Sequence, residues 1–208
     1  MEELYAKSGD RVLRIGEKYL CSRIDPKVEA ERWLAGHRDQ ITKSKGLVIL
    51  GLGAGYHVAL LRKRYPTKQI VIFEQSERCR QFAEKLFPLE LFDTPILTGN
   101  DESAITEDHS VQRLLAARYS ILSHPASVDL NLAWYEKIRE QLLGRTLSGF
   151  RLQLASHPSF SSMGQKPLLW LNEVPVNWRI FDPMDSGGPE EISDQDFFII
   201  KTLRELIK

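Results

Sequence analysis

Short apolar runs alternate with amphipathic stretches through the middle of the chain, and this alternation predicts a parallel α/β domain. Residues 47–50 are wholly apolar, as expected of a strand buried on both faces. Residues 69–73 form a second apolar run that ends in Glu74. Two shorter strands are predicted at residues 95–98 and 119–122.

Helical patterns separate these strands. Asp25 followed by Pro26 predicts a helix start, because Asp caps N-termini and Pro suits the first helical position. Further helices are predicted at residues 77–87, in the second half of 102–118, and at 131–143, the last ending before Gly144. We therefore expect a doubly wound, mostly parallel, Rossmann-like sheet of the class I methyltransferase type.

The patterning also suggests how the chain is divided. Residues 1–45 read as an N-terminal extension with a hairpin turning at Gly16, followed by a helix. Residues 46–149 carry the Rossmann-like pattern. Residues 150–208 are rich in Pro, Ser and Gly and end in an amphipathic helix. We expect this last stretch to be an irregular cover that belongs to the same domain.

Composition narrows the possible partners. The 208 residues carry 28 basic and 28 acidic side chains, so no net charge attracts nucleic acid or an anionic membrane. Cys21 and Cys79 fit neither a metal spacing nor a disulfide framework. The start resembles no signal peptide, and no apolar run approaches the ~20 residues of a membrane span. A soluble cytoplasmic protein without a metal is the expectation.

A glycine-rich loop follows the first strand and supplies the candidate chemistry. Gly51, Gly53 and Gly55 are spaced two apart, unlike the dinucleotide fingerprint G-x-G-x-x-G. The loop is most similar to that of class I S-adenosylmethionine-dependent methyltransferases. That similarity implies S-adenosylmethionine or another nucleoside-containing ligand over the glycines, with Glu74 on the ribose hydroxyls and Asp101 near the base.

Other features of the loop argue against catalysis. Many such methyltransferases carry an acid two residues before the first glycine, where this chain has Ile49, and their fourth strand often ends in a catalytic motif. Here the fourth strand runs into Ser123-His124-Pro125, so no catalytic residue is identified. The glycines could instead pack a tight turn, with Glu74 a solvated strand-end charge. His57 could face a ligand or cap the turn.

Three separated segments together resemble the N-terminal domain of the motility accessory factor (Maf) proteins, which are associated with bacterial flagellin glycosylation. The first is the "S-x-x-D-P-x-x-E-A" stretch within residues 20–32. The second joins the "G-x-G-x-G-Y-H" loop at 49–57 to the strand-end acid at 72–74, and the third joins 123–125 to the helix at 131–143.

This resemblance implies an accessory or ligand-binding module in flagellar or surface-protein glycosylation, with flagellin or a glycosylation enzyme as protein partner. The sugar-transfer domain of longer family members is not recognised here, so no transferase residue is carried over. The chain is then a stand-alone module or a piece of a longer relative. Two alternatives stay open: a methyltransferase acting on a small molecule, and a purely structural interaction protein.

Overall fold

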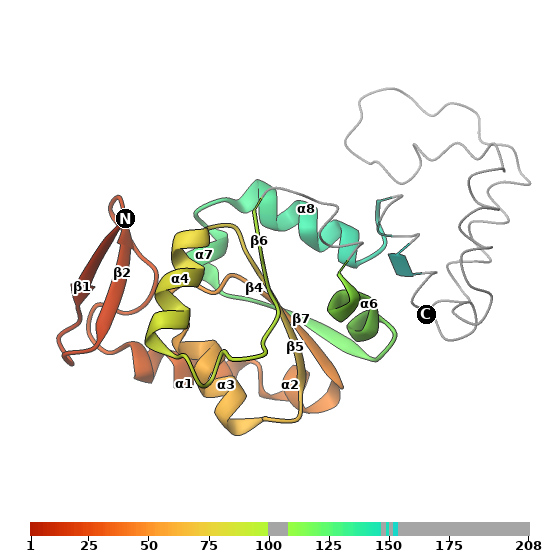
Figure 1. Cartoon of the computed structure of the whole chain (residues 1–208), viewed down its shortest axis with the longest axis horizontal. Coiled ribbons are helices and arrows are strands. Elements are labelled where there is room, and N and C mark those ends of the chain that lie inside the picture. Colours follow the sequence, from red (N-terminus) through yellow and green to blue (C-terminus); the bar gives the residue numbers. More distant parts are fainter. Residues whose placement is uncertain (100–107, 147–148, 150–151, 154–208) are drawn as a thin grey trace, which may run out of the picture.

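The computed structural model describes residues 1–99 and 108–146 with residues 149, 152 and 153 (Figure 1). Within these described residues, four parallel strands form the central sheet in the order β6-β5-β4-β7. Their bounds are β4 Gly46–Leu50, β5 Gln69–Glu74, β6 Ile96–Thr98 and β7 Tyr119–Ser123. A mixed α/β domain with helices flanking a parallel sheet is thus confirmed, and it is consistent with a Rossmann-like fold.

The two central strands are apolar because both of their faces are covered. Leu47 and Ile49 of β4 belong to one core cluster, together with residues of α1 (Pro26–Gly36), α3 (Tyr56–Arg64) and α4 (Glu77–Leu86). Val48 and Leu50 point to the opposite face, where they pack with α6 (His109–Leu115) and α8 (Leu132–Leu142). Successive strand residues alternate between faces, so a doubly covered strand needs apolar residues at every position.

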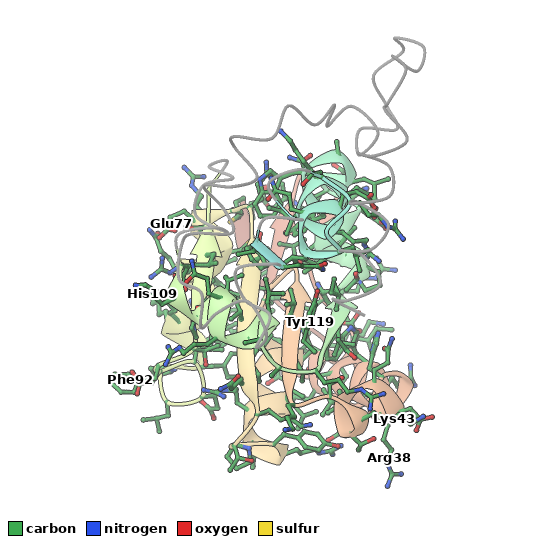
Figure 2. All side chains as sticks on the ribbon, turned by 90° about the vertical axis from the view of Figure 1, so that its right-hand side faces the viewer. Arg38, Lys43, Glu77, Phe92, His109 and Tyr119 are labelled. Carbon is green, nitrogen blue, oxygen red and sulfur yellow. The ribbon has the colours of Figure 1, made fainter. Side chains whose placement is uncertain are left out.

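The predicted helix signals act as expected. The Asp25 side chain accepts hydrogen bonds from the backbone N–H groups of Lys27 and Val28, and Pro26 opens α1. Asn131 caps α8 through the N–H of Trp134. Two short helices were not predicted: α2, Arg38–Lys43, and α7, Pro125–Val128. Figure 2 shows Arg38 and Lys43 at the end of the molecule opposite Glu77, which begins α4.

The N-terminal extension forms a small antiparallel sheet beside the main domain (Figure 1). Its hairpin, β2 (Arg11–Ile15) and β3 (Lys18–Tyr19), turns at Gly16 as predicted, and β1 (Glu2–Tyr5) adds an unpredicted strand. The Tyr56 hydroxyl, at the start of α3, donates to the Arg11 carbonyl at 2.7 Å. The extension therefore packs directly on the glycine loop and its helix.

Several expectations lie outside the described residues, namely those for 100–107 and for most of 147–208. Cys21 and Cys79 are both free and buried. Among the helices of residues 1–99 and 108–146, none has the length and apolar composition needed to cross a membrane.

Candidate functional site

The candidate site lies at the carboxyl edge of the sheet, where the strand order reverses. From β4 the chain moves outward to β5 and β6, then returns to place β7 on the other side of β4. Parallel α/β sheets bind ligands in the crevice beyond such a reversal, because the flanking connections diverge there. The glycine loop after β4 and the His124-Pro125 turn after β7 border this point.

Glu74, at the end of β5, is buried with 3% of its surface exposed, so it is no solvated charge. One carboxylate oxygen accepts hydrogen bonds from the N–H groups of Leu52 and Gly53 at 2.7 and 3.1 Å. The other accepts from the Ser76 N–H at 3.0 Å and the Tyr135 hydroxyl at 3.3 Å. Burial raises the pKa of Glu74, and the donated hydrogen bonds oppose that rise. The loop amides and the Glu74 carboxylate therefore lie together, but they hydrogen-bond each other and not a ligand.

Close packing accounts for the loop glycines. All three have positive φ, 94° for Gly51, 52° for Gly53 and 88° for Gly55. A Cβ on Gly51 would lie 2.4 Å from Cβ of Ser127, and one on Gly53 would lie 2.8 Å from Cε1 of His124. At Gly55, α4 leaves no room for a Cβ atom. The turn after β7 thus covers the first two glycines. Asp101, the fifth candidate residue, lies outside the described residues.

A cavity of about 530 Å³ opens beside the glycine loop. Three stretches line it: positions of the extension and α1 between residues 20 and 33, the loop and start of α3 at 54–57, and positions between 124 and 129 in and around α7. Gly55 lines this cavity, whereas Gly51, Gly53 and Glu74 do not. The volume falls within the ~300–1,000 Å³ of small-molecule sites.

Two stacked histidines form part of the cavity wall. The rings of His57 and His124 are 4.3 Å apart between centroids and within 5° of parallel. His57 Nε2 donates to the Gly51 carbonyl at 3.2 Å, and His124 Nδ1 lies 2.9 Å from the Ser127 hydroxyl. Trp33 of α1 packs edge-on against His57. Sequence reasoning placed His57 beside the loop, but no signal in the sequence pairs it with His124.

Both imidazoles are neutral at pH 7. Burial lowers the pKa of His124 to about 4, and burial followed by the neighbouring His124 lowers the pKa of His57 well below its usual range. Burial also raises the pKa of the Cys21 thiol, in the same wall, to about 12. In the part of the chain that the structure describes, no three His, Cys, Asp or Glu side chains gather as a metal site would require.

The depressed pKa of His124 predicts that acid destabilises the fold. In the unfolded chain this ring takes up a proton below about pH 6.5, whereas the folded protein resists protonation until near pH 4. Stability is therefore complete above pH 6.5 and is lost as the pH falls. Between pH 7 and pH 5, His124 alone should cost about 2 kcal/mol. Urea unfolding of wild type and His124→Asn at both pH values measures the difference.

His109, exposed at the start of α6, supplies the control. His109→Gln should keep the wild-type pH dependence, whereas His124→Asn should lose about 2 kcal/mol of it. Equal pH dependence in wild type and His124→Asn would show that His124 does not resist protonation in the folded state.

Fold and site together define a mixed α/β domain, consistent with a Rossmann-like fold, with a ligand-sized cavity at the reversal of its strand order. In comparisons of the chain with protein-family models, curated proteins and solved structures, nothing matched.

Proposed function

We propose that this chain is a Rossmann-like binding module that holds a nucleoside-type small molecule in the cavity between α1 and the β7–α7 turn. We further propose that it serves as an accessory domain in bacterial flagellar or surface-protein glycosylation, as its resemblance to the N-terminal domain of Maf proteins implies. Flagellin or a glycosylation enzyme would then be its protein partner.

One observation carries this proposal: the three segments that resemble the Maf domain line a single cavity. They are far apart in the sequence, yet Pro26, Gly55 and His124, one from each segment, all contribute to its wall. Packing of a core would not by itself require these segments to enclose open space, since protein interiors are close-packed. A shared cavity therefore supports binding as the reason for their combination.

The chemistry of the wall suits an organic molecule. Most of the lining side chains are apolar or aromatic, including Trp33 and Tyr56, and the carboxylate, guanidinium and imidazole groups come from Glu29, Arg32, His57, His124 and Asp129. Arg32, exposed on α1, adds a cation at this wall. Glu29 is engaged with the backbone N–H of Ser22 at 2.6 Å. These features support a ligand with an apolar ring and a small number of hydrogen-bonding groups.

A methyltransferase acting on a small molecule is the alternative, and the geometry supports it less. The Gly51-x-Gly53-x-Gly55 loop and Glu74 favour the class I methyltransferase type of fold, because they end adjacent strands. A cofactor over the first two glycines, however, would need the space that Ser127 and His124 occupy. Binding in the neighbouring cavity needs no such rearrangement.

Titration calorimetry tests the binding proposal. The probes are S-adenosylmethionine, S-adenosylhomocysteine, adenosine, guanosine, cytidine and uridine. Ala126 lines the cavity, so Ala126→Phe should occupy part of it and weaken binding of the best probe at least about tenfold. Ala35, exposed on α1 and away from the cavity wall, provides the matched variant Ala35→Phe, which should bind as wild type does.

Absence of binding by the wild-type chain to every probe would refute the nucleoside-type ligand. Equal weakening by both phenylalanine variants would refute the location. The proposed role in glycosylation is tested separately, by deleting the gene in its bacterium and measuring flagellin and surface glycans by mass spectrometry. Loss of glycan is the expected result, and unchanged glycans with unchanged motility would contradict the role.

A further inference from the structure

The acid that the fold would offer to a ribose is fully occupied in this chain. An ionised carboxylate has about four lone-pair sites on its two oxygens. Glu74 receives four hydrogen bonds, from the N–H groups of Leu52, Gly53 and Ser76 and from the Tyr135 hydroxyl. It is also buried and absent from the cavity wall. Hydroxyl groups of a ligand in the cavity must therefore find other partners.

The stacked histidines offer such partners. His57 and His124 are 4% and 6% exposed, and both line the cavity. Each ring uses one nitrogen within the protein, Nε2 of His57 and Nδ1 of His124. The other nitrogen of each ring has no hydrogen-bond partner among the described residues. Neither of these two nitrogens is completely buried. Both remaining nitrogens therefore keep some accessible surface, and both residues line the cavity.

The hydrogen-bonding roles of these two nitrogens follow from their ring partners. A carbonyl only accepts, so His57 must donate Nε2–H to Gly51 and keep a lone pair on Nδ1. The Ser127 hydroxyl can donate or accept, so Nε2 of His124 can take either role. The site thus presents one fixed acceptor beside one adaptable group on parallel rings.

We infer that the cavity takes a ligand with a vicinal diol, and that His57 Nδ1 and His124 Nε2 hydrogen-bond its two hydroxyl groups. The diol is that of a ribose in a nucleoside or of a monosaccharide, since both carry the same chemistry. This inference rests on the proposed function, because it requires a small molecule in the cavity. Neutral imidazoles suit uncharged hydroxyl groups, and both rings are neutral at pH 7.

Calorimetry on the full wild-type chain tests the inference with paired probes. Each ribonucleoside is compared with its 2′-deoxynucleoside, and methyl α-mannoside is compared with its 2-deoxy analogue. Removing one hydroxyl leaves a buried nitrogen unpaired, so the deoxy probe should bind about 10- to 100-fold more weakly. The pair of probes that shows this ratio, nucleosides or mannosides, identifies whether the diol belongs to a ribose or to a monosaccharide.

Two variants remove the nitrogens assigned to the ligand, together with the ring stack, and keep the other hydrogen bond of each side chain. His57→Gln retains a group that can donate to the Gly51 carbonyl, and His124→Asn retains one that can reach Ser127. In the variant whose histidine binds the hydroxyl that the deoxy probe lacks, the ratio between hydroxyl and deoxy probes should fall to about twofold or less, whereas general weakening would leave the ratio unchanged in both variants. His37→Gln, which alters a ring packed on Trp33 outside the cavity wall, should keep the wild-type ratio.

The first two of three possible outcomes separate the two proposals. If nucleosides bind but wild type prefers neither member of a pair, the diol inference is wrong and the proposed function stands. If only the glycoside pair binds and discriminates, the diol inference holds with a sugar as its source, and the nucleoside part of the proposed function fails. If no probe of either kind binds, both proposals are refuted.

Discussion

Gly51→Ala is expected to destabilise the folded domain by about 4 kcal/mol, because it combines backbone strain with a clash. Gly51 has φ 94°, a conformation that L-residues rarely adopt. Its new Cβ would also lie 2.4 Å from Cβ of Ser127, an atom that moves only with its backbone. Since total stability is about 5–15 kcal/mol, urea unfolding should show a large loss.

Gly16→Ala is the control that introduces backbone strain without a clash. Gly16 has φ 56° and open space around its Cβ position, so Gly16→Ala should cost only about 1 kcal/mol. Adding Ser127→Gly to Gly51→Ala removes the obstructing atoms and should recover part of the stability. If Gly51→Ala lowered the free energy of unfolding no more than Gly16→Ala, the close packing of the turn after β7 on Gly51 would be contradicted.

Glu74→Ala is expected to lower the stability of the ligand-free protein by about 3 kcal/mol. The substitution leaves the N–H groups of Leu52, Gly53 and Ser76 and the Tyr135 hydroxyl without their acceptor. Each unpaired buried donor costs about 1–3 kcal/mol, and water entering the space left by the side chain reduces the total. Glu74→Gln keeps an acceptor oxygen and should lose about half as much.

Glu77, exposed at the start of α4 near the same edge of the sheet, gives the matched control (Figure 2). Glu77→Ala should change stability by no more than about 0.5 kcal/mol. A residue reserved for a ligand would behave differently from Glu74, because its removal leaves the ligand-free fold unharmed or more stable. Unfolding curves of ligand-free Glu74→Ala that match wild type would therefore contradict a structural role for Glu74 as the acceptor of the loop amides.

Local signals predicted the elements whose sequences specify them without help from the rest of the fold. The apolar runs of β4 and β5 and the Asp25 cap of α1 are of this kind. The helix α2 and the strand β1 were missed because each is too short for a periodicity to show, and α2 is also mostly polar. Their positions depend on tertiary packing, for which Ile41 of α2, buried in the core, is an example.

Only the glycine loop and Glu74 of the candidate site were predictable from the sequence. The spacing of the glycine loop and Glu74 placed both at one edge of the sheet, which the structure bears out as geometry. Tyr135 was recognised as an apolar position of a helix, yet its hydroxyl reaches Glu74. The stack of His57 on His124 joins two distant turns and depends on the strand order, so no local pattern could reveal it.

A crystal structure of the protein with the most tightly bound probe tests the central claim most directly. We predict density for the ligand in the cavity between α1 and the β7–α7 turn, within hydrogen-bonding distance of His57 and His124, with Glu74 still bound to the loop amides. A ligand lying instead over Gly51 and Gly53, with the Glu74 carboxylate turned toward it, would contradict the account.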